Sequence, residues 1–125
     1  MSVKLNHTIV FSRDKAESAA FLTGILGLPA AVAFGPFLGV KVDNDVTLDF
    51  MDTDEKIMLQ HYAFLVSEAE FDTIFARIRE RKLDYWSDPG RTRRGETYTF
   101  NGGRGVYFMD PSGHLLEIQT RPYVD

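Results

Sequence analysis

The sequence predicts an α+β protein in which a βαβββ module occurs twice, over residues 1–56 and residues 57–125 of a single domain. Two observations predict this fold. The order of a strand, a helix and three short strands appears in both halves of the chain, and His7 and His61 occupy equivalent places in the first strand of each half. Because one small sheet with one helix buries its apolar faces poorly, the two modules are expected to pack together.

The first module starts with period-2 alternation over residues 1–11, which predicts a strand. Ser12 stands where a helix N-cap is expected, and apolar residues then recur at helical spacing from Arg13 until Gly27 ends the helix. Three short strands separated by turns are expected at residues 30–34, 37–42 and 46–51. The polar residues 52–56 are expected to link the modules.

The second module repeats this order with a strand at residues 60–66. Ser67 and Glu70 form an S-x-x-E capping box, and apolar residues at helical spacing predict an amphipathic helix that ends near Lys82. A long loop is expected at residues 87–96. The remaining strands are expected at residues 98–100, 105–109 and 115–120, the last of them after a hairpin turn at 110–113.

Composition narrows the possible functions. The chain has no cysteine, so a bound metal must be held by histidine, carboxylate, carbonyl or water, and a cysteine-free chain fits a reducing cytoplasm. The N-terminal segment has no apolar run typical of a signal peptide, and no stretch approaches the ~20 apolar residues of a membrane span. The net charge of −4 gives no indication of a nucleic-acid partner.

A candidate metal site consists of His7, His61 and Glu117. Glu117 lies in an apolar strand, where a buried and unpaired carboxylate would be costly. Two neutral imidazoles and one carboxylate form the facial triad of a divalent metal such as Fe, Mn, Zn or Ni, with open positions for substrate or oxygen. The alternative is that both histidines are ordinary strand residues and that Glu117 faces solvent. His114 is left out, because it lies beside a turn and points away from Glu117.

The long loop and its flanks form a candidate substrate-binding region. Its arginines are Arg91, Arg93, Arg94 and, at its end, Arg104. They are interpreted either as a lid that attracts an anionic substrate, such as a carboxylate or phosphonate, or as a solvated loop. Trp86 and the neighbouring Tyr85, Tyr98 and Phe100 could line an aromatic pocket or belong to the core.

Three segments, LNHTIVFSRD, LQHYAFLV and GVYFMDPSGHLLEI, resemble those of the glyoxalase, bleomycin-resistance and extradiol-dioxygenase superfamily, also called vicinal oxygen chelate proteins. The resemblance covers nearly the whole chain. It implies paired βαβββ modules that form a cup-shaped sheet around a divalent metal, with His7, His61 and Glu117 as ligands. It also implies a homodimer, because family members of this size usually form one, and in many of them the halves of one site come from different chains.

The resemblance leaves several reactions open. Glyoxalase-type members need a fourth ligand where this chain has Asp49, which is either a ligand or base or a solvent-facing edge residue. Fosfomycin-resistance members place a threonine two residues beyond the first histidine, but Ile9 stands there and Thr8 faces the other way, which argues against fosfomycin modification. Ring-cleaving dioxygenases need a nearby acid–base group, which Tyr62, Tyr98 or Tyr107 could supply.

The sequence therefore predicts a metal-dependent enzyme for a small, anionic substrate that chelates the metal through vicinal oxygens. Dioxygenase-like cleavage is the favoured reaction, because only three metal ligands are identified with support. Glyoxalase-like lyase chemistry is the second candidate. The alternative is a metal-free protein of the bleomycin-resistance type that sequesters a drug or metabolite.

Overall fold

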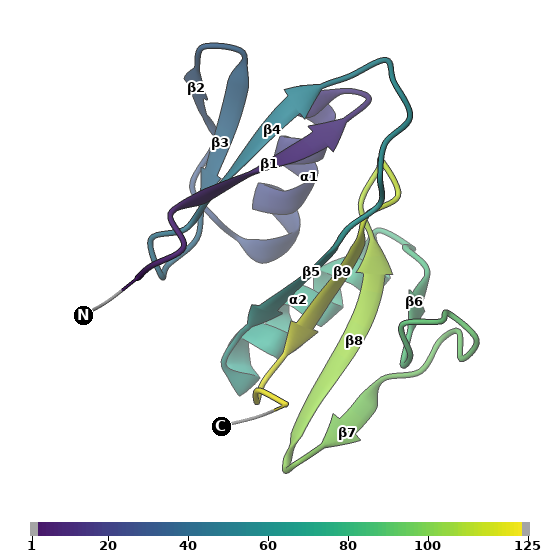
Figure 1. The fold of residues 1–125 in the computed structure, drawn as a ribbon. Coiled ribbons are helices and arrows are strands. Elements are labelled where there is room, and N and C mark those ends of the chain that lie inside the picture. The colour runs from purple at the N-terminus through teal and green to yellow at the C-terminus, as the bar shows by residue number, and fades with distance from the viewer. Residues whose placement is uncertain (1–2, 124–125) are drawn as a thin grey trace. The chain divides into compact units, whose positions relative to one another are not determined.

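The computed structural model describes residues 3–123, and the chain divides into two compact units between Met58 and Leu59. The units are called unit 1 and unit 2 below, and each is described by itself. Each unit contains one sheet and one helix (Figure 1), which confirms the predicted α+β class. Neither of the two described helices is long and apolar enough to cross a membrane.

Unit 1 holds the first five elements, which are β1 (His7–Ser12), α1 (Lys15–Leu26), β2 (Val32–Phe34), β3 (Phe37–Lys41) and β4 (Thr47–Asp52). The strand order in the sheet is β1-β4-β3-β2, with β1 and β4 parallel and the other pairs antiparallel. The first strand begins later than predicted. Residues 1–2 lie outside the described residues, and residues 3–6 are not in the strand, because the pairing with β4 starts only at His7.

The first helix is capped by Asp14 and not, as predicted, by Ser12. β1 continues through Ser12, which pairs with Asp52 of β4 and is fully buried, so the chain can turn into a helix only after it. The Oδ1 atom of Asp14 accepts hydrogen bonds from the backbone N–H groups of Ala16 and Glu17. The predicted end is correct, because Gly27 follows the helix in the left-handed conformation at φ 73°.

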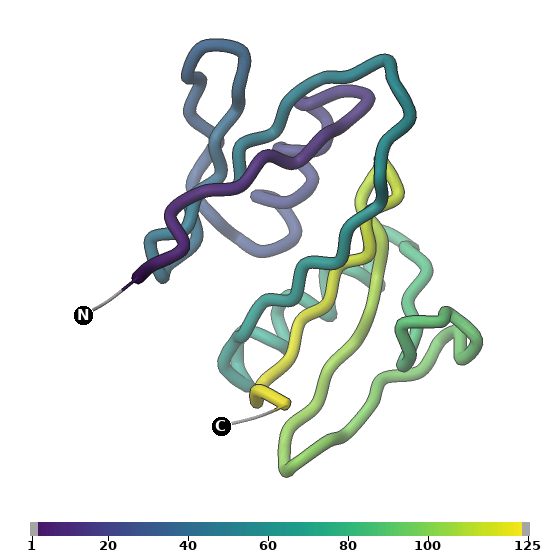
Figure 2. Tube along the Cα trace, in the orientation of Figure 1, coloured from purple at the N-terminus to yellow at the C-terminus, as the bar shows by residue number. Residues whose placement is uncertain are grey.

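Unit 2 holds β5 (His61–Leu65), α2 (Glu68–Glu80), β6 (Tyr85–Trp86), β7 (Tyr98–Phe100), β8 (Gly103–Met109) and β9 (Leu115–Gln119). The strand order is β5-β9-β8-β6, and β7 also pairs with β8. The first and last strands of this sheet, β5 and β9, run parallel side by side (Figure 2), as β1 and β4 do in unit 1. The sequence did not predict β6, because two residues are too short to show a periodic pattern.

The two faces of each sheet differ in character. One face packs against the helix of its own unit and carries the buried core, which in unit 2 includes Val106, Phe108, Leu116 and Ile118. Because side chains alternate along a strand, their neighbours in sequence lie on the opposite face, away from the helix. In unit 2 those neighbours include Tyr107 and Glu117, so this second face holds the candidate site.

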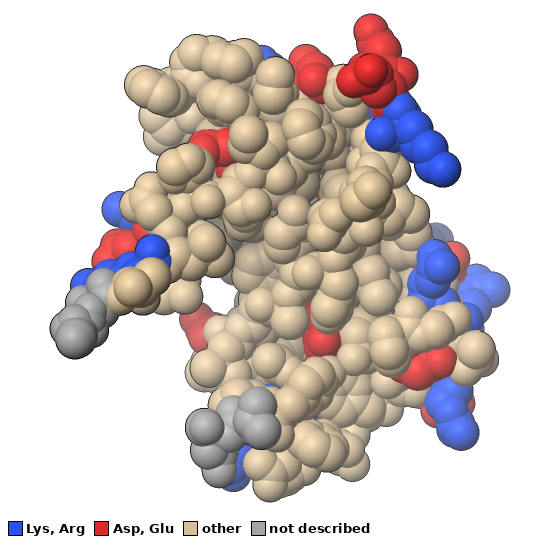
Figure 3. Space-filling model, viewed as in Figure 1, with Lys and Arg blue, Asp and Glu red and all other residues tan. Residues whose placement is uncertain are grey.

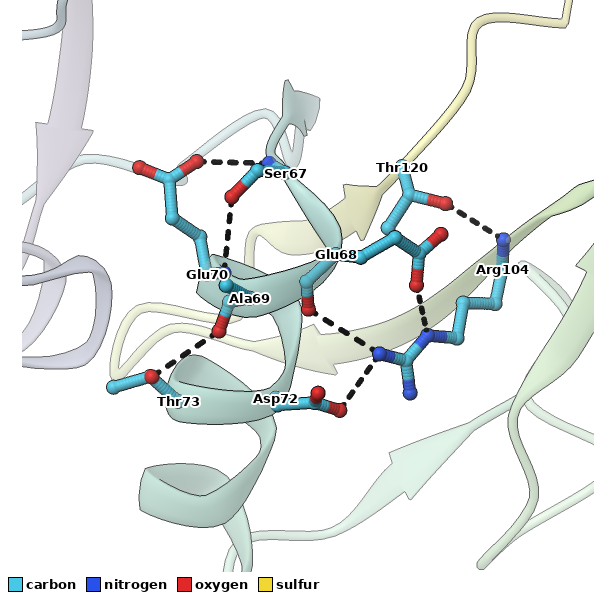
Figure 4. Close-up of polar contacts among 8 residues, drawn as sticks. All are labelled: Ser67, Glu68, Ala69, Glu70, Asp72, Thr73, Arg104 and Thr120. Atoms are coloured by element: carbon cyan, nitrogen blue, oxygen red, sulfur yellow. Dashed lines mark hydrogen bonds and ion pairs between the residues drawn. The ribbon is translucent and has the colours of Figure 1, made fainter.

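Helix α2 is held at its start by the predicted capping box, which the structure confirms (Figure 4). The Ser67 hydroxyl accepts from the backbone N–H of Glu70 at 3.1 Å, and the Glu70 carboxylate accepts from the backbone N–H of Ser67 at 2.8 Å. Hydrogen bonds from the Ser67 backbone, and then from its side chain, lower the pKa of Glu70. The charged carboxylate therefore stabilises the fold.

The capping box gives a pH-dependent prediction. Ser67→Ala is expected to lower the free energy of unfolding by about 1 kcal/mol at neutral pH, and Glu70→Ala by a smaller amount because Glu70 is exposed, measured by urea denaturation. A lowered pKa in the folded state means that the Glu70 contribution is present above its unfolded pKa of ~4.3 and is lost as the pH falls through the folded value. The deficit of Glu70→Ala should shrink on acidification. A deficit that stays constant down to pH ~3 would contradict this account.

Candidate metal centre

The candidate site in unit 2 is built on the sheet face opposite α2. Three neighbouring strands meet there in register, since Glu117 of β9 is paired with Tyr107 of β8 and with Ala63 of β5. Two residues before Ala63 on the same strand, His61 shares this face. The sheet therefore places a histidine, a carboxylate and a tyrosine from three strands side by side.

Glu117 is fully buried, and both of its carboxylate oxygens have partners. The Oε1 atom lies 3.1 Å from Nε2 of His61. The Oε2 atom accepts a hydrogen bond from the hydroxyl of Tyr98 and another, at 2.5 Å, from the hydroxyl of Tyr123. A buried carboxylate is costly unless it is hydrogen-bonded or paired with a cation, so this arrangement is what makes its burial tolerable.

The protonation of His61 follows from its second ring nitrogen. Its Nδ1 atom lies 3.0 Å from the carbonyl oxygen of Leu115, which can only accept, so Nδ1 carries the proton. In the neutral ring Nε2 would then present a lone pair to Oε1 of Glu117, 3.1 Å away, and either a second ring proton or a bound cation makes this contact favourable. Histidine ligands of metals characteristically donate their other N–H to a backbone carbonyl in this way.

The spacing of the two acceptors fits a shared metal ion. Nitrogen and oxygen ligands bound at ~2.0–2.2 Å to one ion lie roughly 2.8–3.1 Å apart in octahedral geometry and roughly 3.3–3.6 Å apart in tetrahedral geometry. The Nε2 atom of His61 and the Oε1 atom of Glu117 fall in the octahedral range. Within either unit, over residues 3–123, no third histidine, aspartate or glutamate joins them. Unit 2 therefore brings together two of the three residues predicted as ligands.

The three tyrosines next to Glu117 are hydroxyl donors and not bases. Burial is the main cause that raises the pKa of Tyr98, Tyr107 and Tyr123 above the usual range, and the charge of Glu117 adds to it. The hydroxyl of Tyr123 donates to Glu117, so the hydroxyl of Tyr107, 2.8 Å away, must donate to the oxygen of Tyr123. The predicted Tyr98 and Tyr107 thus lie at the site and support its carboxylate.

A single glycine makes room for this network. Gly105 of β8 is paired with Tyr98 of β7, and the ring of Tyr98 lies directly over it. A Cβ atom at position 105 would collide with that ring, so only glycine lets Tyr98 reach Glu117 across the sheet.

The third predicted ligand, His7, lies at the start of β1 in unit 1. It is exposed, and its Nδ1 atom lies 2.7 Å from the side-chain oxygen of Asn6, so its Nε2 atom is the nitrogen left to bind a cation. The two units match in register. His7 is paired with Thr47 and His61 with Leu115, and Asp49 and Glu117 follow two residues further along β4 and β9. Asp49 thus holds in unit 1 the place that Glu117 holds in unit 2.

The arginines of the candidate substrate region separate into two groups. Arg104 lies on the helix side of the sheet, opposite Glu117, which corrects the expectation that it binds substrate (Figure 4). Its guanidinium pairs with Glu68 at 2.7 Å and Asp72 at 2.6 Å and lies 4.3 Å from the centre of the Phe71 ring. Consecutive residues of a strand place their side chains on opposite faces of the sheet. Gly105 lies on the face of Glu117, so the side chain of Arg104 lies on the face covered by α2.

The loop arginines stay at the surface. Arg94 is exposed and pairs with Asp84 at 2.9 Å, and Arg91 donates to the sulfur of Met109. Figure 3 shows Lys and Arg side chains gathered over the part of unit 2 that holds β6 and the following loop. Trp86 of β6 is paired with Tyr107 and therefore lies on the same sheet face as Glu117. A substrate-binding residue is expected on this face.

Tyr62 and His114 lie on the sheet face of unit 2 that packs against α2. Tyr62, expected as a possible acid–base group, faces away from Glu117, and its ring lies 6.0 Å from that of His114. His114 was left out of the candidate site, and it is buried and accepts the backbone N–H of Gln60 at 3.0 Å. Neither residue belongs to the candidate site.

Sequence reasoning missed two residues of the site face. Tyr123 lies beyond the last strand, outside any periodic pattern, and nothing in the sequence signals that it returns to Glu117. Gln119 follows Glu117 at the strand period of two, and its buried Oε1 atom has no hydrogen-bond partner among the described residues. The strand period alone could have placed Gln119 on this face.

Comparison of this chain with known protein families identifies the family to which the fold belongs. The chain belongs to the glyoxalase/bleomycin resistance protein/dioxygenase superfamily, whose family model matches residues 4–118.

Individual relatives are enzymes by name. The solved structure of oxidase ChaP-H1 is 60% identical with a TM-score of 0.97, and covers 99% of this chain and 100% of its own. Oxidase ChaP-H2 is 57% identical with a TM-score of 0.97, over 100% of this chain and 98% of its own. The metallothiol transferase FosB of Shouchella clausii (strain KSM-K16) is 40% identical in an alignment of 128 positions that covers 93% of this chain and 79% of the relative.

The position of Arg104 gives a prediction about stability. Arg104→Gln removes two ion pairs and the contact with Phe71 that tie β8 to α2, so it should lower the melting temperature by a few degrees. The matched control, Arg94→Gln, loses one exposed pair and should change it little. Equal melting temperatures for the two variants would show that the α2 contact contributes nothing measurable.

Proposed function

We propose that this protein is a metal-dependent enzyme that oxidises a small substrate held through two vicinal oxygens, with His7, His61 and Glu117 as the ligands of one divalent ion. The observation that carries the proposal is the 3.1 Å contact between the Nε2 atom of His61 and the Oε1 atom of the buried Glu117, with the Nδ1 atom of His61 bound to a backbone carbonyl. His7 is the third ligand in this proposal, because it holds in unit 1 the register position that His61 holds in unit 2.

A divalent ion at these ligands would supply a Lewis acid for the substrate oxygens and an open position beside them. The residues of the chain have separate tasks. Glu117 provides the negative charge that holds the cation, and His61 provides a neutral nitrogen whose orientation the carbonyl of Leu115 fixes. Trp86 of β6, paired with the buried Tyr107 of β8, provides a half-exposed aromatic ring against which a flat substrate would pack and exclude water.

Oxidation is favoured over the other reactions of the family by the identities of 60% and 57% to two oxidases. A second candidate is thiol transfer, supported by the identity of 40% to a metallothiol transferase. Asp49 occupies the register position of Glu117 in unit 1, and in the oxidase proposal it serves as a base or is solvated and is not a required ligand.

The ligand set makes a direct prediction about metal content. Protein purified without chelators should contain about one Fe, Mn, Zn or Ni per site, measured by inductively coupled plasma mass spectrometry. His7→Ala, His61→Ala and Glu117→Gln should each lose most of it, because removing one of three ligands weakens binding by orders of magnitude. The control His114→Asn alters a histidine on the helix side and should keep the metal. Full metal content in Glu117→Gln would refute the site.

Substrate chelation can be tested with catechol, a small aromatic that carries vicinal oxygens. We expect catechol to bind to the metal-loaded protein and not to the metal-free protein or to Glu117→Gln, as measured by calorimetry. Equal binding to all three would support the sequestering alternative instead. Two further measurements on the iron-loaded protein distinguish the candidates. Uptake of oxygen supports the oxidase, and consumption of a thiol supports the transferase.

We also propose a homodimer, because the sheet face of unit 1 opposite α1 leaves large apolar side chains uncovered. Val32 and Phe34 of β2 are 70% and 79% exposed, and Ile9 and Phe11 of β1 are partly exposed. Figure 3 shows an uncharged surface over β2. Light scattering should give the mass of two chains for the wild type and of one chain for Phe34→Glu, which puts a charge on this patch. A wild-type monomer would overturn the proposal.

A further inference from the structure

The Oε2 atom of Glu117 differs from the Oε1 atom in one respect that bears on metal binding. A carboxylate oxygen has two lone pairs, and both lone pairs of Oε2 are used by phenol hydroxyls, from Tyr98 and from Tyr123. Among the described residues, the side-chain contact recorded for Oε1 is with Nε2 of His61. One oxygen is thus saturated by the protein and the other is left for a cation.

The donors themselves are fixed by further contacts. Tyr98 reaches Oε2 only because Gly105 gives its ring room on the sheet. Tyr123 is held between its donor Tyr107, at 2.8 Å, and the ring of Phe100, which meets its own ring edge-on at 5.5 Å. The hydroxyl proton of Tyr123 must point at Glu117, because its oxygen already accepts from Tyr107.

We infer that Tyr98 and Tyr123 are positioning residues that hold Oε2 of Glu117, so that Glu117 binds the metal through Oε1 alone. This inference rests on the proposed function, since it presumes a metal ion beside His61. A free carboxylate can rotate about its last bond and bind an ion through both oxygens. Two phenol donors on one oxygen prevent that rotation and leave coordination positions open for the substrate.

The segment after β9 takes part in the proposed metal site through Tyr123. Tyr123 lies outside the last strand, yet its hydroxyl reaches the carboxylate through the only contact with Glu117 that comes from beyond β9 among the described residues. Metal binding and the docking of this segment should therefore be coupled, because each depends on the orientation of the same carboxylate.

The test is a Co²⁺ titration of the full-length protein, followed by visible absorption and by competition with a chelator. Tyr98→Phe and Tyr123→Phe each remove one hydroxyl and keep the ring. We expect each variant to bind Co²⁺ about 10–100-fold more weakly, the usual cost of losing a partner of a metal ligand. The absorption spectrum should also change in intensity and position, because the freed oxygen can enter the coordination sphere.

Tyr85→Phe is the matched control. Its ring packs on Phe75 at 5.0 Å, on the helix side of the same sheet, so this variant should bind Co²⁺ with the affinity and spectrum of the wild type. Melting temperatures identify any variant that fails to fold. If Tyr123→Phe does not fold, Tyr98→Phe alone decides the question, because both hydroxyls bind the same oxygen.

The outcomes separate this inference from the proposed function. If the wild type binds Co²⁺, Glu117→Ala does not, and both phenylalanine variants match the wild type in affinity and spectrum, the positioning role is wrong and the metal site stands. If the wild type binds no Co²⁺, the proposed function fails and the positioning role fails with it. Weaker binding with an unchanged spectrum would also overturn the inference, because a merely loosened structure would give that result.

Discussion

The burial of the Glu117 carboxylate is the constraint on which the rest of the site depends. A charge with no exposed surface must be compensated inside the protein, and the compensation here comes from three sides. Two phenols bind one oxygen, and the other faces a histidine nitrogen that carries no proton when the ring is neutral. In the proposed site a divalent cation bound by His61 and Glu117 would complete this balance, because it would satisfy both acceptors at once.

The repeated module explains why such a site can arise from simple parts. In each unit the helix covers one sheet face and holds the core there, which leaves the other face free to carry polar residues. The same register then places a histidine at the start of the first strand and a carboxylate two positions along the neighbouring last strand. Unit 2 adds β7 to this plan, and with it Tyr98, which supports Glu117 and lies over Gly105 of β8.

The sequence predicted what depends on local patterns and missed what depends on tertiary packing. His61 and Glu117 were found because strand period and apolar context are local, and the structure places them together. Tyr123 was missed because its contact comes from a segment with no period. Ser12 was expected to cap a helix, but strand pairing held it in β1. Arg104 was grouped with the loop arginines of the candidate substrate-binding region, but its side chain pairs with α2. A cluster of charges in the sequence does not show on which face of a strand each side chain lies.

The central claim is that His61 and Glu117 share one metal ion through Nε2 and Oε1. Anomalous diffraction at the absorption edge of the bound metal, from crystals of the metal-loaded protein, tests it most directly. The account predicts one strong peak at ~2.0–2.3 Å from both atoms, with Oε2 still held by Tyr98 and Tyr123. A peak at another place, or the two atoms left facing each other with no metal between them, would contradict it.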